Sequence, residues 1–206
     1  EKEREVKPPS RVWRVVPTAQ QPAGPAWVVG TLFHAALRYW RFPGEGDLEA
    51  FLRPFALQAG LTDPREIGAT IAEARRLLAR FQAAPIYARL AQAERHHEVA
   101  YTLILNGRAR SGVVDLLCQI DGEWTVVEFK TDELDALADV RPHIKRRGYE
   151  RQMREYVAAV TRLVGERPRG LWVFVNVGGE VVEIELDPSV DCGRIHSMNI
   201  DLCGSD

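Results

Sequence analysis

Two short turns constrain the fold of this chain more than any other feature of its sequence. Asn106-Gly107 and Asp121-Gly122 are dipeptides that favour two-residue hairpin turns. Both lie between runs rich in Val, Ile, Leu, Thr and Tyr, which are typical of strands. The stretch 98–131 is therefore predicted to form three consecutive antiparallel strands.

These turns place three acidic side chains in a row across the predicted sheet. Counting back from each turn puts Glu98 opposite Asp115 and Asp115 opposite Glu128, unless a β-bulge shifts the register. Directly opposed residues lie roughly 4.5–5.5 Å apart at Cβ, and like charges at that spacing are destabilising. A divalent cation shared by the carboxylates would offset the repulsion, so the row predicts a metal site.

A lysine joins this row. Glu128 and Lys130 are two residues apart on one predicted strand and share a face, while the backbone carbonyl of Phe129 between them offers another oxygen ligand. Metal-held carboxylates beside a lysine suit hydrolysis of a phosphodiester by an activated water. The plainer reading of Glu128-Phe129-Lys130 is a solvated strand face. That interpretation does not suit Asp115, because Asp115 interrupts the mostly apolar run 112–118, where an unpaired carboxylate is costly.

Helical periodicity is predicted on both sides of the three strands. Before them, apolar residues recur at helical spacing after Trp27, and residues 44–93 form a helical insertion. After them, residues 143–164 form an amphipathic helix, 171–175 a buried strand reached by a crossover, and 181–186 a closing hairpin strand. The expected fold is α/β with a mixed sheet flanked by helices.

Composition limits the class of protein. At 206 residues and 46% hydrophobic, the chain can bury the core of one domain, predicted at 27–187, with a linker or surface arm at 1–26 and a loose tail at 188–206. Three widely spaced cysteines suit neither a disulfide framework nor a zinc knuckle and favour a reducing, intracellular compartment. The sequence contains no apolar run of membrane-spanning length, so no membrane partner is expected.

The net charge of −2 excludes a molecule that is basic overall, so any nucleic-acid-binding surface must be local. The stretch 141–154 is the candidate, because it carries six basic residues against one acidic residue. A solvated helix face is the alternative interpretation. The phosphate-binding candidates are Lys145, Arg146, Arg147 and Arg151.

Five short motifs together resemble the nuclease domain of the RecB/AddA type, within the PD-(D/E)XK superfamily, over roughly residues 27–187. The domain forms the carboxy-terminal part of bacterial helicase-nucleases with UvrD/Rep-like helicases. Val114 stands where the superfamily's nominal proline would be, and Glu128 where aspartate is common. The matching stretches are Gly30-Thr31-Leu32-Phe33-His34, Glu98, Gly112-Val113-Val114-Asp115, Glu128-Phe129-Lys130-Thr131 and Gln152-Met153-Arg154-Glu155-Tyr156.

The resemblance implies a role for each matched residue. It makes His34, Asp115 and Glu128 the metal ligands, with Phe129 contributing its carbonyl, and Lys130 the catalytic lysine. Gln152 and Tyr156, four apart on one helix face, would face DNA or support the site, and Glu98 would act behind the ligands or through a water. The expected cation is Mg²⁺, with Mn²⁺ equally suited to a histidine ligand. Some relatives carry a four-cysteine iron–sulfur cluster, and we expect none here, because the cysteines are Cys118, Cys192 and Cys203.

The resulting expectation is a restriction-endonuclease-like core that cuts DNA with a metal-activated water, within a larger bacterial, cytoplasmic helicase-nuclease for DNA repair or recombination. Two alternatives stay open. One is a module of the same fold that grips DNA or a partner protein without cutting. The other is metal-dependent hydrolysis of RNA.

Overall fold

The computed structural model describes residues 24–105 and 107–187. The predicted tail at 188–206 and most of the predicted arm at 1–26 lie outside these ranges, as does Asn106 of the first turn. The elements in chain order are α1 (Ala26–Arg38), α2 (Leu48–Gln58), α3 (Pro64–Ala83), α4 (Pro85–Gln92), β1 (Arg95–Leu105), β2 (Arg108–Ile120), β3 (Glu123–Lys130), a 3₁₀ turn (Leu137–Asp139), α5 (Val140–Arg147), α6 (Tyr149–Val164), β4 (Arg169–Val177) and β5 (Glu180–Glu185).

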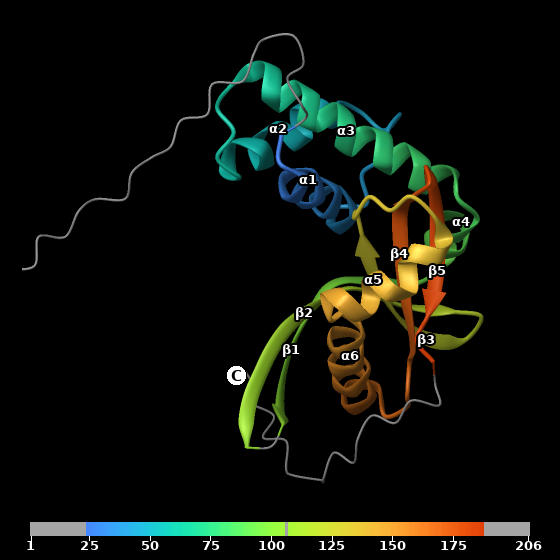
Figure 1. Cartoon of the computed structure of the whole chain (residues 1–206). Helices are drawn as coiled ribbons and strands as arrows, with labels where there is room; N and C mark the ends of the chain where they lie inside the picture. The colour runs from blue at the N-terminus through green and yellow to red at the C-terminus, as the bar shows by residue number, and fades with distance from the viewer. Residues whose placement is uncertain (1–23, 106, 188–206) are drawn as a thin grey trace, which may run out of the picture.

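The strands form one mixed sheet in the order β1-β2-β3-β4-β5. All neighbours are antiparallel except β3 and β4, which are parallel and are joined through α5 and α6. Parallel neighbours need such a crossover, whereas the antiparallel pairs need only tight turns. The predicted fold class, a mixed sheet flanked by helices, is confirmed. Figure 1 shows the sheet between two sets of helices.

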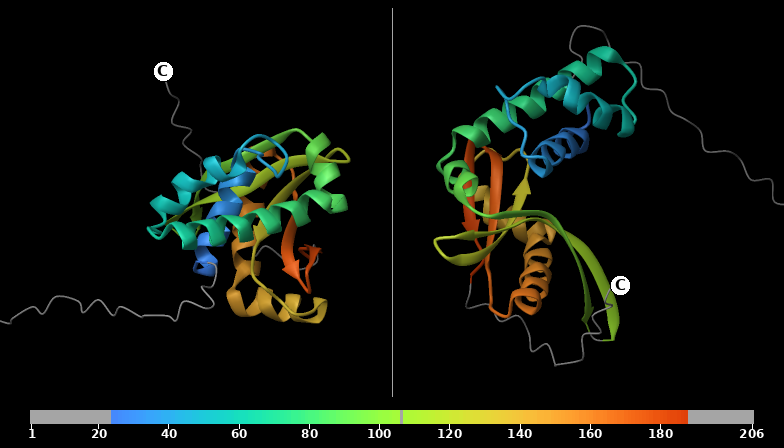
Figure 2. Two further views of the ribbon diagram at one scale, coloured as in Figure 1. Left: turned by 90° about the horizontal axis from the view of Figure 1, so that it is seen from above. Right: turned by 180° about the vertical axis from the view of Figure 1, so that it is seen from behind.

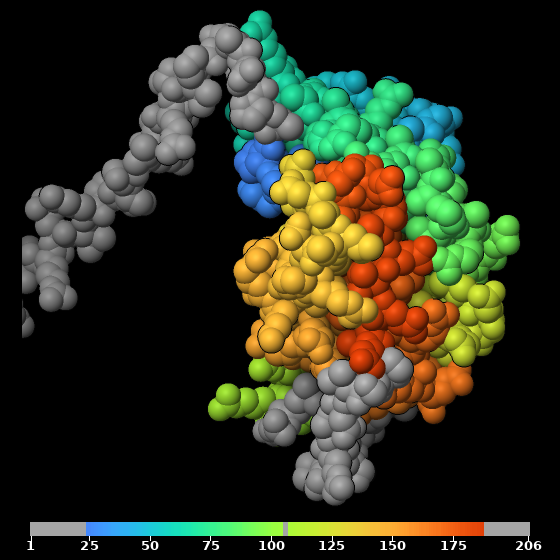
Figure 3. Space-filling view, turned by 45° about the vertical axis from the view of Figure 1, so that its right-hand side comes forward, coloured from blue at the N-terminus to red at the C-terminus, as the bar shows by residue number. Residues whose placement is uncertain are grey.

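The helices that precede β1 and the helices that follow β3 cover opposite faces of the sheet (Figure 2). The helices α1 to α4 pack with Leu116 and Phe129 in one core. The pair α5 and α6 packs with Leu117 and Val126 in a second core. Successive strand residues point to opposite faces, so one apolar strand serves both cores. The edge strand β5 is part of the outer surface, beside α4 and α5 (Figure 3).

Both predicted hairpins have the predicted register. Leu105 pairs with Arg108 around the first turn, and Ile120 pairs with Glu123 around the second. The β1–β2 ladder is interrupted between Val99 and His97, where Glu98 has a positive φ of 50°. Counting residues from each turn therefore predicts the strand pairing correctly. The predicted pair Glu98 and Asp115 is the exception, because the ladder is distorted at Glu98.

The amphipathic stretch 143–164 is two helices rather than one. α5 ends and α6 begins at Gly148, whose φ is 72°. This left-handed conformation is readily adopted by glycine and ends a helix. The break turns the basic end of α5 away from the axis of α6, and it places Tyr149 at the beginning of α6.

The helical insertion at 44–93 contains α2, α3 and α4. Asp63 caps α3 by accepting a hydrogen bond from the backbone N–H of Arg65 at 2.8 Å, and Pro64 occupies the first helical position. The apolar face of α3, including Leu78 and Phe81, is buried against α1 and the sheet. The insertion therefore forms part of the hydrophobic core. Within the described ranges, no helix has both the length and the apolar character needed to cross a membrane.

Candidate active site

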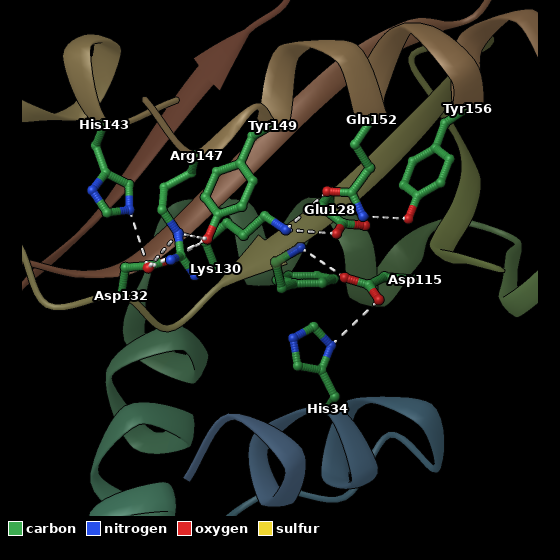
Figure 4. Close-up of polar contacts among 11 residues, drawn as sticks. His34, Asp115, Glu128, Lys130, Asp132, His143, Arg147, Tyr149, Gln152 and Tyr156 are labelled. Carbon is green, nitrogen blue, oxygen red and sulfur yellow. Dashed lines mark hydrogen bonds and ion pairs between the residues drawn. The ribbon is translucent and has the colours of Figure 1, made fainter. Parts of the chain in front are cut away.

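His34 lies on α1 and faces the bend in β2. Its Nδ1 is 3.4 Å from Oδ1 of Asp115 (Figure 4). Gly30, one turn earlier, lets the helix approach β3, because a Cβ there would be 3.1 Å from Oγ1 of Thr131. Burial lowers the pKa of His34, but the neighbouring Asp115 carboxylate more than offsets this, and the pKa is raised. The glycine–threonine–histidine motif thus has a packing reason as well as a chemical one.

Asp115 is held by groups from two other elements. Its Oδ2 accepts a hydrogen bond from the backbone N–H of Phe129 at 3.0 Å, and its Oδ1 faces His34. Burial alone would raise the pKa of this carboxyl, but the imidazole of His34 and the Phe129 N–H outweigh burial and lower it. Asp115 is therefore the ionised member of the acidic pair.

Glu128 has the opposite electrostatic character. The residue is 4% exposed, and its Oε1 accepts a hydrogen bond from Nζ of Lys130 at 2.8 Å. Its Oε2 is buried and accepts no hydrogen bond from any group in residues 24–105 and 107–187. The side chain of Glu128 also hydrogen-bonds to Asp115, which helps to lower the pKa of Asp115. Burial and the negative charge of Asp115 raise the pKa of Glu128 to about 7, against the opposing effect of Lys130. An orphaned carboxylate oxygen beside a second carboxylate is what a cation would neutralise.

The predicted helix residues meet this group from α6. Lys130 donates a second hydrogen bond to Oε1 of Gln152 at 3.2 Å, and Nε2 of Gln152 donates to the hydroxyl of Tyr156 at 2.7 Å. Burial, followed by the charges of Glu128 and Asp115, raises the pKa of Tyr156, which keeps the phenol protonated. Gln152 and Tyr156 thus continue the hydrogen-bonded chain that begins at Glu128.

Glu98 lines a hollow together with Asp115 and Glu128, but it forms an ion pair with a residue of α1. Its Oε2 lies 2.9 Å from Nη1 of Arg38 on α1. A hollow of about 590 Å³ is lined by Glu98, Asp115 and Glu128 together with residues of α1 and α6. Its volume is in the range of ligand sites. Arg38 is therefore a cation at the rim of the acidic row that the sequence motifs did not indicate.

A second hollow of about 750 Å³ lies on the other side of Lys130 and shares Trp27 and His34 with the first. A polar cluster at this hollow is formed by Asp132, His143, Arg147 and Tyr149 (Figure 4). Sequence reasoning named Arg147 as a phosphate-binding candidate but missed its three partners. Asp132 follows the matched lysine–threonine pair directly, which was its only signal in the sequence. The partners come from α5 and α6, whose junction at Gly148 no motif marks.

The four predicted phosphate-binding residues are all exposed, but they differ in their contacts. Arg146 Nη2 lies 3.0 Å from Nδ1 of His143, and Arg147 Nε donates to the hydroxyl of Tyr149 at 3.2 Å. Lys145 and Arg151 are the members of the set without a hydrogen bond or ion pair to another described side chain. The structure therefore divides the four predicted residues into two arginines that contact other side chains and two cations that do not.

The donor set suits a divalent metal ion. Carboxylate oxygens from Asp115 and Glu128, the carbonyl of Phe129 and an imidazole from His34 are ligands used by Mg²⁺ and Mn²⁺. The orphaned Oε2 of Glu128 is the observation that favours such a fit. Among residues 24–105 and 107–187, no three His, Cys, Asp or Glu side chains are already gathered closely enough to hold an ion.

Comparisons of sequence and structure identify what the chain is similar to. No curated protein matches the sequence. A candidate exonuclease from Eubacterium rectale has a similar fold, with a TM-score of 0.56 and 16% identity, over 85% of this chain. The chain spans 62% of the length of that relative. SSO0001 gives a TM-score of 0.36, 17% identity and coverage of 80% of this chain and 68% of the other. The protein VC1899 from Vibrio cholerae gives a TM-score of 0.30 and 12% identity, and the match covers 73% of this chain and 42% of the other.

Only the first of these likenesses supports the fold, because the other two TM-scores are low. The family comparison covers most of the chain. The model of the PD-(D/E)XK nuclease superfamily matches residues 10–199, which include every site residue described above. The five-stranded mixed sheet with its flanking helices agrees with the restriction-endonuclease-like fold of that superfamily. The chain therefore belongs to the PD-(D/E)XK nuclease superfamily.

Proposed function

We propose that this chain is a divalent-metal-dependent DNA nuclease that hydrolyses phosphodiester bonds with a metal-activated water. The observation that carries the proposal is the buried Oε2 of Glu128, which accepts no hydrogen bond from any described group and lies next to Asp115, within the same hydrogen-bonded group as Lys130. Leaving a carboxylate oxygen unpaired in the protein interior costs about 1–3 kcal/mol or more. Such a cost is expected where a bound cation completes the site.

His34, Asp115, Glu128 and the carbonyl of Phe129 would hold the ion. When bound, the ion neutralises phosphate charge and lowers the pKa of a coordinated water. The remaining work belongs to the side chains of the chain itself. Lys130 places a positive charge beside the acids, where negative charge develops on the phosphate. Gln152 and Tyr156 keep Lys130 on the α6 side of the hollow.

A role within a bacterial helicase-nuclease for repair or recombination deepens this proposal, with RecB/AddA-type enzymes as the reference and Mg²⁺ as the physiological ion. Its support is the order of the five matched motifs, from the glycine–threonine–histidine of α1 to the glutamine and tyrosine of α6. Co-purification of a helicase with the full-length natural protein would test it. Recovery of the natural protein without any helicase partner or helicase domain would overturn it.

The proposed cleavage is tested with linear and circular DNA in Mg²⁺ or Mn²⁺. The wild type, Asp115→Asn, Lys130→Ala and the control Arg75→Ala are purified identically. Arg75 is exposed on α3 and lines a different hollow. We expect wild type and Arg75→Ala to cleave equally, and both site variants to lose about 100-fold or more, as for removal of one group that stabilises transition-state charge. Equal degradation by all four proteins would show a contaminating nuclease and reject the proposal.

The competing function is a module that grips DNA without cutting it. The absence of three preassembled ligands among the described residues favours this alternative. Calorimetry with Mn²⁺ separates the two functions, because a nuclease should give a binding heat that disappears in Asp115→Asn. DNA binding by a wild type that shows no such heat and no cleavage would favour the binding module. Cleavage of RNA in preference to DNA would instead support the third possibility, a metal-dependent ribonuclease.

A further inference from the structure

The ring of Tyr149 faces the ammonium group of Lys130. Nζ of Lys130 lies 4.0 Å from the centre of the ring, within the range of a cation–π contact. The same ammonium group donates to Glu128 at 2.8 Å and to Gln152 at 3.2 Å. An ammonium has three N–H donors. Two carboxylate or amide oxygens and one aromatic face therefore surround Lys130, which is only 12% exposed in its side chain.

Tyr149 is itself fixed by its hydroxyl. The phenol donates to Oδ2 of Asp132 at 3.0 Å and accepts from Nε of Arg147 at 3.2 Å. The ring of His143 packs edge-on against Tyr149, with 5.8 Å between ring centres (Figure 4). The phenol is thus held at its polar end, and its ring is packed on the side.

The Asp132 end of this arrangement is also held. Nε2 of His143 lies 3.0 Å from Oδ1 of Asp132, and Arg146 approaches Nδ1 of the same ring at 3.0 Å. Because a guanidinium only donates, Nδ1 of His143 is the acceptor of this contact. Nε2 lies within ion-pair distance of Asp132, but it forms no hydrogen bond with a described group. The arginines of α5 that the sequence suggested for phosphate binding therefore support Asp132 and Tyr149 in this structure.

We propose that Tyr149 is a positioning residue for Lys130: its ring, held by Asp132 and Arg147, keeps the ammonium directed at Glu128 and Gln152. The inference rests on the proposed nuclease function for its catalytic consequence, but the contact itself does not. Without the ring, the flexible four-carbon stem of the lysine gains conformations in which Nζ leaves the acids. Tyr149 makes no contact with Asp115 or Glu128 among the described interactions, so its effect is exerted through Lys130.

Two variants separate the ring from the hydroxyl. Tyr149→Phe keeps the aromatic face, whereas Tyr149→Leu removes it. The control Trp124→Leu removes another half-buried aromatic from the far end of β3. The first readout is the NMR signal of the Lys130 Cε protons, assigned by its loss in Lys130→Ala. We expect an upfield ring-current shift in wild type, most of it retained in Tyr149→Phe and Trp124→Leu, and none of it in Tyr149→Leu.

The second readout is steady-state cleavage of a DNA duplex. We expect Tyr149→Leu to lower kcat by roughly 10- to 100-fold with KM for DNA unchanged, the scale at which misplacement of a catalytic group by about 1 Å acts. Tyr149→Phe should retain at least a third of wild-type kcat. A loss of stability alone would instead follow the melting temperature, and Trp124→Leu shows how much activity such a loss removes.

Several results would overturn the proposal. One is a Lys130 signal in wild type at the position of a solvent-exposed lysine, which also decides the case if Tyr149→Leu does not fold. Another is equal kcat for Tyr149→Leu and Trp124→Leu. A Tyr149→Phe variant as impaired as Tyr149→Leu would assign the effect to the hydroxyl rather than to the ring. If wild type does not cleave at all, the nuclease proposal fails, while the NMR readout still decides whether Tyr149 positions Lys130.

Discussion

At the scale of single residues, the site consists of two carboxyl groups whose environments separate their protonation. Asp115 accepts from a backbone N–H and faces an imidazole, whereas one buried oxygen of Glu128 accepts no hydrogen bond from the described part of the chain. The pKa of Asp115 is lowered and that of Glu128 is raised to about 7. Near neutral pH without metal, the pair therefore shares less than two full negative charges. If Glu128 is a metal ligand, as proposed, binding of the cation requires Glu128 to lose its proton.

This difference predicts how stability depends on pH. An unfolded glutamate titrates near its ordinary pKa of 4.5, whereas folded Glu128 titrates near 7. Between these values the folded state holds the extra proton, so in EDTA the free energy of unfolding should fall as pH rises from about 5 to 8. The loss should be on the order of 3 kcal/mol. His34, with its raised pKa, acts in the same direction as pH rises through its folded pKa.

Urea unfolding at pH 5, 6, 7 and 8 measures this dependence in wild type and in Glu128→Gln. The amide cannot ionise, so the variant should show a much flatter curve and should exceed wild type in stability at pH 8. Asp115 acts in the opposite direction, since its lowered pKa gives stability that is lost as pH falls below about 4. Parallel curves for wild type and Glu128→Gln between pH 5 and 8 would contradict the raised pKa of Glu128.

Metal binding should restore the free energy of unfolding that is lost as pH rises to 8. At pH 8, Mn²⁺ at 100 times its dissociation constant is expected to stabilise the wild type by about 2.7 kcal/mol, because it binds the folded state. Asp115→Asn and Glu128→Gln each remove a proposed ligand and should show little of this gain. Thermal unfolding with and without EDTA provides the measurement. A gain of equal size in all three proteins would place the metal elsewhere in the chain.

At the scale of elements, the two turns made the sheet register predictable from sequence. Two-residue turns leave no freedom in pairing, so the ladders of Arg95–Cys118 and Leu116–Val127 follow from counting. The positive φ of Glu98 was not predictable, because nothing in the local sequence calls for a left-handed glutamate. Val114 and Leu117 lie in the same core, whereas strict alternation along β2 would group Val114 with Leu116 and Cys118.

The contacts that could not be predicted from the sequence lie in the crossover segment between β3 and β4. The matched motifs indicated His34, Lys130 and Gln152, and the structure does group them around the acids. The Asp132–Tyr149 contact depends on the angle between α5 and α6 at Gly148, and an amphipathic period carries no information about that angle. Sequence periodicity finds which face of a helix is buried, but the helix junction decides which polar side chains meet.

The glycine of the Gly-x-x-Asp motif gives a prediction at this scale. A Cβ on Gly112 would lie 2.6 Å from the hydroxyl oxygen of Tyr101 and 2.7 Å from its ring. Tyr101 packs against Tyr156, with 5.6 Å between ring centres. Gly112→Ala should therefore displace Tyr101, destabilise the fold by about 1–3 kcal/mol through overpacking, and lower cleavage through Tyr156.

The matched control is Gly68→Ala, in the interior of α3. A Cβ on Gly68 would meet nothing within 4 Å, so this substitution should stabilise the helix by about 0.5–1 kcal/mol. Both free energies of unfolding are measured by urea titration. Restoration of the stability and activity of Gly112→Ala by a second substitution, Tyr101→Ala, would confirm the cause. Equal stability of Gly112→Ala and wild type would contradict it.

At the scale of the whole molecule, a chain of net charge −2 has to attract a polyanion through a local surface. The acidic hollow opens between α1 and α6, and the exposed cations Lys145 and Arg151 lie on α5 and α6. Because Arg146 and Arg147 contact His143 and Tyr149, these two exposed cations are the better candidates for binding backbone phosphate. Arg38 adds a cation at the rim of the hollow on the α1 side.

Salt dependence of DNA binding tests this distribution of charge. Each phosphate contact contributes a slope of about −0.9 to the dependence of log affinity on log salt concentration. Lys145→Ala and Arg151→Ala should each weaken binding similarly for all sequences and reduce the slope by about 1, whereas Arg75→Ala, on the remote part of α3, should change neither. Titrations use Asp115→Asn protein, so that the DNA stays intact, at salt concentrations from about 50 to 200 mM.

If the Lys145 and Arg151 variants keep the slope of the Asp115→Asn parent, the DNA does not cross this surface, and the assignment of phosphate contacts to α5 and α6 would be wrong. A reduced slope in Arg75→Ala alone would instead locate the phosphate contacts on the helical insertion.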